Sequence, residues 1–218
     1  MPYESYRARL NSYGANRSEA TINLSKQSQT QQILSSSTIK YVKLNDNQDL
    51  SPCIVSDIET FHKRRFLFLP DTVINVGDYV EHDSHTYLAT DRTTDEVYPQ
   101  LIGEVCNEIF VLKVKGQRII KGRDDNNRPI YDYPETSYNF PCIFTDKNYN
   151  KIENDSLPTP DISLTVKIPY IPDRIPSVNY EFTMQGGTYK VTNVSREHVI
   201  NGTGFLELRL QRMTGGDS

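Results

Sequence analysis

One short motif that occurs twice constrains the fold of this chain more than any other feature of the sequence. Residues 52–57 read Pro-Cys-Ile-Val-Ser-Asp, and residues 141–146 read Pro-Cys-Ile-Phe-Thr-Asp. A longer pair supports the repeat, because residues 70–91 align without gaps on residues 172–193, with identical Pro, Asp, Val, Thr, Tyr and Thr at a constant offset of 102 residues. Since a repeated segment marks a repeated structural unit, we expect two related units in tandem.

The two repeats differ in their spacing, and the difference predicts an insertion. The short motif recurs after 89 residues and the longer segment after 102 residues, so the second copy is expected to hold 13 additional residues. The stretch 148–160 is rich in Asn, Asp, Ser and Pro, which favour turns and loops. We therefore predict one extra loop there.

The periodicity of the apolar residues predicts a mainly β protein behind a helical arm. Residues 3–34 show the only helical spacing, interrupted at Gly14, and an N-cap with a Glu three residues later is predicted at Asn16. The second helical segment has so thin an apolar stripe that we expect it to become ordered by docking on another surface. From Thr38 onward the period changes to two, which is typical of strands.

The predicted fold class is mainly β, with two related small antiparallel β-barrel or sandwich units in tandem, preceded by the N-terminal helical arm. The predicted boundaries are listed in chain order: a helical docking arm at 1–37, a first β-barrel-like unit at 38–115, a linker or projecting loop at 116–137, and a second β-barrel-like unit at 138–218. Each unit contains a predicted hairpin, and the second is expected to turn at Gln185-Gly186-Gly187, where Gly186-Gly187 suits the positive φ angles of a tight turn.

The cysteine and histidine residues predict neither disulfides nor a metal site. Three Cys give an odd count without a C-x-x-C spacing, and Cys53 and Cys142 occupy equivalent repeat positions within apolar strands. We interpret them as reduced, buried thiols of the core, with Pro52 and Pro141 at the start of each strand. His82 and His85 flank Asp83 but lack a matching ligand at a useful spacing, so we assign them to an exposed turn.

No arrangement of residues predicts an enzyme. The chain lacks the G-x-S-x-G, P-loop, G-x-G-x-x-G and HExxH motifs, and no His is singled out as the partner of a nucleophilic Cys. Most of the Asp residues follow strands, where Asp commonly caps turns. We therefore expect no catalytic residues, no metal and no cofactor.

The charge is unevenly distributed along the chain. Residues 1–43 carry six Lys or Arg and two Glu, whereas the whole chain has a net charge of −4, which leaves −8 for the remainder. An acidic body does not bind nucleic acid by neutralising phosphates, and the basic arm is interpreted as a solvated or partner-facing segment rather than a DNA reader. No apolar run approaches 18 residues, and the first residues show no secretory signal, so neither a membrane span nor export is expected.

Several segments resemble the small β-barrel proteins of tailed-phage necks, known as head-closure or stopper proteins. The run Phe-Leu-Phe-Leu-Pro-Asp at 66–71, followed by Val-Gly-Asp-Tyr-Val at 76–80 and Thr-Tyr-Leu-Ala-Thr-Asp at 86–91, is similar to their V-x-x-G-D…Y-x-V hairpin. Ile74 opens the pattern here and Ala89 closes it, so the match is approximate. Residues 3–14 also resemble the start of structural proteins of phages that infect Gram-positive hosts. Stoppers are usually about half as long and have one barrel, so the second unit has no counterpart in the resemblance.

The resemblance implies a homo-oligomeric ring in the virion neck, assembled in the host bacterial cytoplasm. Its partners would be the portal or adaptor on one side and the tail terminator or tail tube on the other, with viral DNA passing through the lumen. An acidic body suits such a channel, because like charge repels DNA. The alternatives are a tail-terminator, tail-tube or baseplate protein, and a surface module that binds glycans.

Two segments are candidates for partner contacts. The first is the N-terminal arm, with candidate residues Tyr3, Tyr6, Arg7, Arg9, Leu10, Tyr13 and Arg17. The second is a mobile or partner-contacting loop within 116–137, with candidate residues Arg118, Lys121, Arg123, Asp124, Asp125 and Arg128. This second segment could be an ordinary linker between the two units or a long projecting hairpin, because it is polar and rich in turn formers.

Overall fold

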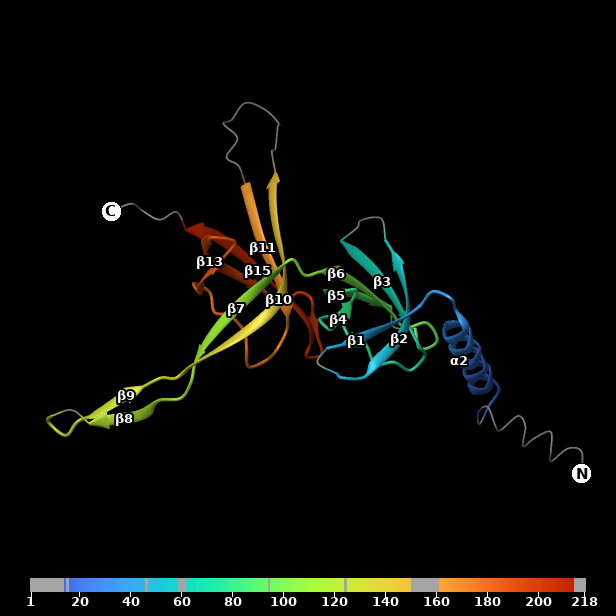
Figure 1. Cartoon of the computed structure of the whole chain (residues 1–218), viewed down its shortest axis with the longest axis horizontal. Coiled ribbons are helices and arrows are strands. Elements are labelled where there is room, and N and C mark those ends of the chain that lie inside the picture. Colours follow the sequence, from blue (N-terminus) through green and yellow to red (C-terminus); the bar gives the residue numbers. More distant parts are fainter. Residues whose placement is uncertain are drawn as a thin grey trace, which may run out of the picture. The chain divides into compact units, whose positions relative to one another are not determined.

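The computed structural model describes residues 14, 16–45, 47–58, 62–93, 95–123, 125–149 and 161–213, except for the side chains of residues 147–149 and 161–163. They form two compact units, which divide between Val105 and Cys106 (Figure 1). The elements are, in chain order, α2 (Arg17–Ser35), β1 (Ile39–Leu44), β2 (Leu50–Asp57), β3 (Lys63–Phe68), β4 (Tyr79–His82), β5 (His85–Thr93), β6 (Gln100–Val105), β7 (Glu108–Lys115), β8 (Ile119–Arg123), β9 (Pro129–Asp132), β10 (Glu135–Tyr149), β11 (Asp161–Pro169), β12 (Glu181–Met184), β13 (Gly187–Ser195), β14 (Val199–Ile200) and β15 (Thr203–Met213).

The first unit is a closed antiparallel barrel. Its strands follow one another around the barrel in the order β1-β2-β3-β6-β5-β4, and β4 pairs back onto β1. Alternate side chains point inward, as the period of two predicts, and Phe66, Phe68 and Leu101 are fully buried. The rings of Phe66 and Tyr87 meet edge to face at 5.4 Å between centroids. Closure leaves this sheet without a free edge, which protects it from unwanted strand pairing.

The second unit has the same strand order. Its sheet runs β12-β13-β15-β11-β10-β7, with the short β14 attached to β15. In this order β7 takes the place of β1, β10 of β2, β11 of β3, β12 of β4, β13 of β5 and β15 of β6. The core again consists of inward-facing strand residues, with Phe110, Val166 and Leu208 fully buried. The prediction of two related β units behind a helix is therefore confirmed.

The backbone repeats at the offset of 102 residues that the sequence shows. The amide of Thr72 donates to the carbonyl of Leu69, and the amide of Arg174 donates to that of Ile171. Each unit also has one bulge at the equivalent position, between Ala89 and Asp91 in β5 and between Val191 and Asn193 in β13.

The threonine at each bulge makes the same contact. The hydroxyl of Thr90 donates to the carbonyl of Ile102 at 3.3 Å, and the hydroxyl of Thr192 donates to that of Arg209 at 3.1 Å. The short side chain thus bonds to the backbone of the neighbouring strand where the ladder is interrupted. This shared contact explains why the repeat retains Thr there.

The two barrels differ in how the last gap between strands is closed. In the first unit, the side-chain oxygen of Asn45 accepts from the amide of Tyr79, and its amide donates to Asp78 Oδ1 at 3.0 Å. In the second unit, Tyr180 stands at the repeat position of Asp78. Its hydroxyl accepts from the amide of Lys113 at 2.8 Å and donates to the carbonyl of Val111 at 3.0 Å, so it bridges to β7.

The twin Pro-Cys motifs lie in equivalent strands, β2 and β10. Cys53 and Cys142 are fully buried core residues, and burial raises the pKa of each thiol to about 12. The prolines do not start their strands, which corrects that expectation. Pro52 instead precedes the ladder between β2 and β3, which begins at Cys53, and Pro141 precedes the ladder between β10 and β11, which begins at Ile143.

The boundary between the units differs from the sequence prediction. Strand β7 pairs along its length with β10, from Glu108 opposite Cys142 to Lys115 opposite Glu135. Residues 106–115 therefore belong to the second unit, although they were assigned to the first, because their ladder partners follow later in the chain. The segment 116–137 lies within the second unit and contains β8 and β9, so it does not link the two barrels.

Helix α2 docks on the chain's own first barrel, next to β1 and β2. Its N-cap is the predicted one, since Asn16 Oδ1 accepts from the amide of Glu19 at 2.9 Å. Ile33 is fully buried and Gln29 nearly so, and Lys26 forms an ion pair with Asp71. The surface on which this helix was expected to dock is thus the chain's own first barrel. Ile33 is the large apolar residue that this contact buries, whereas Ile22, Leu24 and Leu34 of the same helix are exposed.

Two turn predictions need adjustment. The second hairpin turns within the predicted residues, but the positive φ angles belong to Gln185 and Gly186, while Gly187 pairs with Met184; Asp83 and Ser84 form the equivalent turn. His82 is not part of an exposed turn, because its side chain is only 9% exposed and its ring meets Phe66 edge to face. The predicted loop 148–160 falls mainly outside the described residues, although its first two residues belong to β10.

Candidate interaction surface

The main candidate for a functional site is the hairpin of β8 and β9. Figure 1 shows it projecting beyond the ends of β7 and β10, the two strands of the second unit that it connects. At its base, Lys115 pairs with Glu135, and the amide of Gly116 donates to the carbonyl of Pro134 at 2.7 Å. The hairpin is therefore a continuation of a paired ladder, not a loose connection.

The register assigns the side chains of the hairpin to two faces. Ile120 pairs with Tyr131 and Arg123 with Pro129, so these four side chains share one face, because directly opposed residues point to the same side. Arg118 belongs to this face as well, since its guanidinium lies 3.8 Å from the centre of the Tyr131 ring. We call this the Ile120 face.

The opposite face carries the pairs Ile119 with Asp132 and Gly122 with Ile130. Ile130 and Asp132 lie two residues apart in β9, so Ile119 and Ile130 share this side, and a bulge at Lys121 brings Gly122 to it as well. We call this the Ile119 face. Both faces of the ribbon are thus apolar at their centres.

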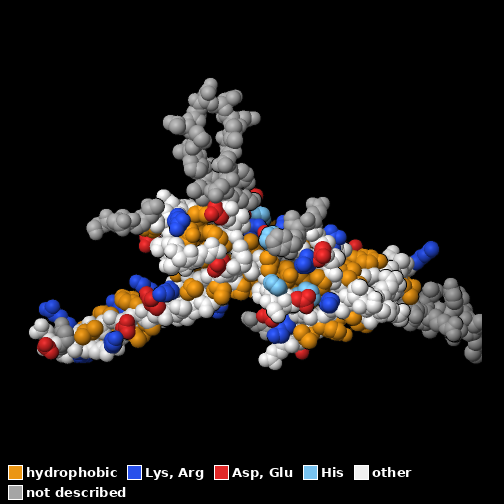
Figure 2. Space-filling view, turned by 45° about the horizontal axis from the view of Figure 1, so that its top comes forward, with side chains coloured by type: hydrophobic (Ala, Val, Ile, Leu, Met, Phe, Trp, Pro, Cys, Tyr) orange, Lys and Arg blue, Asp and Glu red, His pale blue; other side chains and the backbone are white. Residues whose placement is uncertain are grey.

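These apolar side chains are exposed. Ile120 is 65% exposed and Ile119 49%, while Ile130 and Tyr131 are 48% and 41% exposed. Figure 2 shows hydrophobic side chains beside Lys and Arg on the projecting hairpin. A two-stranded ribbon is marginal in water and cannot bury either face against itself. Large apolar side chains exposed on both faces make this hairpin a candidate surface for a partner contact.

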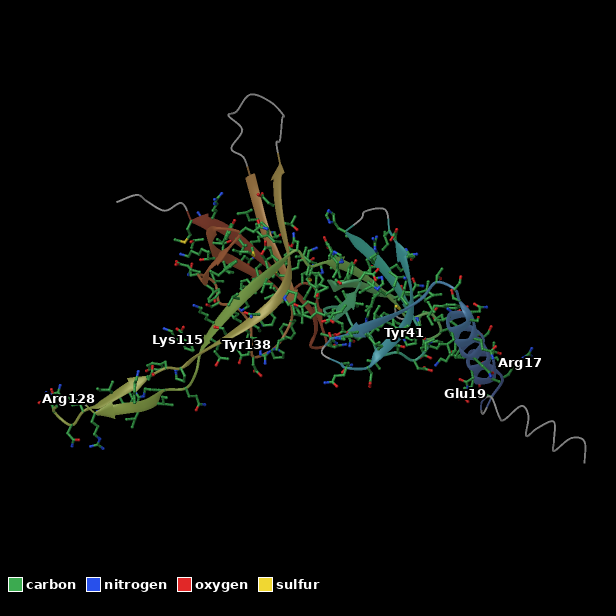
Figure 3. All side chains as sticks on the ribbon, in the orientation of Figure 1. Arg17, Glu19, Tyr41, Lys115, Arg128 and Tyr138 are labelled. Carbon is green, nitrogen blue, oxygen red and sulfur yellow. The ribbon has the colours of Figure 1, made fainter. Side chains whose placement is uncertain are left out.

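The structure brings together four of the predicted contact residues. Arg118, Lys121, Arg123 and Arg128 lie on the hairpin, and Figure 3 shows Arg128 near its tip, far from Lys115 and Tyr138 at its base. Lys121 lies 3.7 Å from Asp132, and Arg123 donates to Asn127 in the turn. Asp125 is exposed in the same turn, and Asp124 lies outside the described residues.

The predicted docking arm is only partly described. Tyr3, Tyr6, Arg7, Arg9, Leu10 and Tyr13 lie outside the described residues. Arg17 is the first residue of α2 and is exposed at the N-terminal end of the helix (Figure 3). This end of the helix belongs to the first unit and the hairpin to the second.

The sequence prediction selected the charged residues of the hairpin and missed the apolar ones. The signal was present, because Ile119-Ile120 and Ile130-Tyr131 flank a turn rich in Asp and Asn. Two short β-branched or aromatic runs around such a turn predict a hairpin. If the two runs pair as a hairpin, one residue of each run points to one face of the ribbon, and the other residue points to the opposite face.

Other chemistry has little support in the described part of the chain. No three His, Cys, Asp or Glu side chains lie close enough there to hold a metal ion. The thiols of Cys53 and Cys142 are protonated near neutral pH, because burial raises the pKa of each to about 12, and a protonated thiol is a poor nucleophile. Helix α2 is not apolar enough to cross a membrane, and no other helix within the described ranges is either.

The comparison with known families agrees with the boundary of the second unit. Residues 109–211 match the model of the YomX C-terminal domain, a phage-derived family. The match begins in β7 and ends in β15, so it includes the hairpin and the whole sheet. No curated protein and no solved structure matches the chain. The similarity supports the coarser prediction, a phage-associated structural protein, whereas the assignment to the neck stays a prediction.

Proposed function

We propose that this protein is a structural component of a tailed-phage neck, which forms a ring of identical subunits between the portal or adaptor of the head and the tail. The observation that carries the proposal is the β8–β9 hairpin, whose two faces are apolar and exposed. An assembly protein uses such a ribbon to bury area against its neighbours. The similarity of residues 109–211 to a phage-derived domain supports the same role.

The design of the barrels is consistent with an assembly role. The first barrel is closed, and the gap of the second is bridged by Tyr180, so strand edges are protected in both units. Each unit can then present loops and hairpins to several partners without aggregating through its sheet. The acidic body, at −8 beyond residue 43, suits a channel through which DNA passes without sticking.

A tail-terminator, tail-tube or baseplate protein is the second candidate. It would use the same β units and the same projecting hairpin, but it would assemble on tube proteins. A module that binds surface glycans fits less well. Of the exposed tyrosines, Tyr41 and Tyr98 belong to the first unit, and Tyr131 and Tyr133 belong to the second.

Inactivation of the gene in the phage separates the candidates. For a neck protein, we expect lysates to contain filled or emptied heads and complete tails that are not joined, as seen by electron microscopy. Restoring the wild-type chain from a plasmid should restore joined particles. Joined particles that fail to adsorb to cells would contradict the proposal and favour a baseplate or glycan-binding role. Absent or overlong tails would favour the tail candidates.

A further inference from the structure

We propose that the Ile120 face of the hairpin docks on an acidic groove of the first barrel in a second copy of this chain. The proposal rests on the ring inferred above and specifies the contact between its subunits. The proposal is argued from the complementary chemistry of two surfaces, the hairpin of the second unit and the groove of the first unit. Because every copy has both surfaces, each copy can both donate a hairpin and receive one.

The receiving groove has a volume of about 310 Å³ and lies between the segments 71–75 and 92–99 of the first unit. Val73 lines it and is 82% exposed, which is a large apolar exposure for a residue in a short ordered connection. Asp71, Asp95 and Glu96 also line it. The groove therefore has an apolar residue with three carboxylates around it.

The single arginine of the groove is directed at the groove's own backbone. The guanidinium of Arg92 donates to the carbonyl of Ile74 at 2.9 Å and to Asn75 Oδ1 at 3.0 Å, which fixes the loop that carries Val73. Lys26 pairs with Asp71 and lies 3.6 Å from Glu96, yet these two carboxylates remain 69% and 75% exposed. The groove can therefore accept further cations.

The Ile120 face complements this groove. It offers an exposed isoleucine and tyrosine at its centre, flanked by Arg118 and Arg123. The segment 113–128 carries six Lys or Arg against two Asp, whereas residues 44–105 of the first unit carry four Lys or Arg against twelve Asp or Glu. An apolar centre surrounded by charges of opposite sign is the usual arrangement of a specific interface.

The contact joins two different surfaces, so it is a head-to-tail contact. Such a contact produces a closed ring if the rotation from copy to copy closes, and an open filament if it does not. It also covers only one side of the ribbon. The Ile119 face, with Ile130, stays available for the portal, adaptor or tail proteins of the proposed function.

Disulfide trapping between two variants tests the contact. Val73→Cys and Ile120→Cys are prepared as separate proteins with tags of different size, both with Cys106→Ser, and are mixed under mild oxidation. Cys53 and Cys142 do not form disulfides under these conditions, because burial raises the pKa of each thiol to about 12. We expect a mixed disulfide that carries both tags. The matched control replaces the second partner by Ile200→Cys, on β14 of the same unit and 69% exposed, which should give at least tenfold less product.

Electron microscopy of the same mixtures keeps the contact and the ring distinguishable. Rings with the specific disulfide support both. Rings without the specific disulfide overturn the proposed contact but not the proposal that the protein forms a ring. A specific disulfide in chains that never form rings or filaments, even with portal and tail proteins added, supports the contact and overturns the ring. Equal cross-linking of Ile120→Cys and Ile200→Cys overturns the contact, because random collision would then explain the product.

Discussion

Tyr180→Phe isolates the contribution of one hydroxyl group to the closure of the second barrel. In the wild type the hydroxyl accepts from the amide of Lys113 at 2.8 Å and donates to the carbonyl of Val111 at 3.0 Å. Phenylalanine keeps the ring, which packs on Phe110 and Phe182 at 6.0 and 6.2 Å between centroids. The substitution therefore removes two hydrogen bonds and almost no apolar contact.

The expected loss of stability follows from those two bonds. A hydrogen bond contributes about 0.5–1.5 kcal/mol net, so two give about 1–3 kcal/mol. Lys113 lies at the surface, where water can replace the hydroxyl as acceptor, so we expect about 1–2 kcal/mol. For a unit of this size, each kcal/mol corresponds to a lowering of the Tm by about 4–8 °C.

Urea unfolding and amide hydrogen exchange measure the effect. We expect a lower midpoint for the second unit at unchanged slope, and faster exchange at the amide of Lys113 than at amides of the first barrel. Tyr170→Phe is the matched control, because within the described residues its hydroxyl makes no hydrogen bond, and it should leave both readouts unchanged. Wild-type stability and wild-type protection of Lys113 in Tyr180→Phe would refute the assigned role of the hydroxyl.

Four further predictions concern the cores and the arm. Cys53→Ser and Cys142→Ser should each lower stability by about 1–3 kcal/mol, because a buried hydroxyl replaces an apolar thiol, and zinc in the purified wild type would contradict this structural role. The raised thiol pKa values favour the folded state fully below pH 9.0, and this contribution should be lost as the pH rises from 9.0 to about 12, as followed by thermal unfolding. Ile33→Ala should expose the amides of α2 to exchange while the barrels stay folded, and Leu34→Ala on the exposed side is its control. Deletion of residues 1–15 should leave α2 and both barrels folded but abolish docking on neck proteins, and unchanged docking would rule out the arm as a docking element.

The deletion is set before Asn16 for a structural reason. A cut after residue 34, as the sequence prediction of an independent arm would suggest, also removes the buried Ile33 and the ion pair between Lys26 and Asp71. A loss of docking would then be inseparable from damage to the first barrel. Asn16 must stay because it caps the first turn of the helix.

The sequence predicted the elements with strong local signals. The strand at 162–168 alternates in polarity, and the structure shows β11 there. The N-cap at Asn16 was recognisable because a capping side chain and the amide it binds lie only three residues apart. Such features depend on residues that are neighbours in the chain, so they can be recognised from the sequence alone.

The sequence prediction failed where two neighbouring segments in the chain belong to different sheets. Strand β7 follows β6 after two residues and was grouped with it, yet β7 pairs with β10, which begins only at Glu135. Apolar alternation shows that a strand exists but not which strand it pairs with. The same limit explains why 116–137 looked like a linker: its residues are polar at the turn, and their pairing is seen only in space.

The sequence by itself determined that the chain is a duplication, because identical residues at an offset of 102 residues require equivalent turns, and the structure shows these turns with matching hydrogen bonds. Only the tertiary structure decided how each copy closes. Asn45 completes the first barrel and Tyr180 the second, by contacts with residues 33 or more positions away. Closure depends on which strands meet, and the hairpin is exposed because, among the described strands, β8 and β9 pair only with each other.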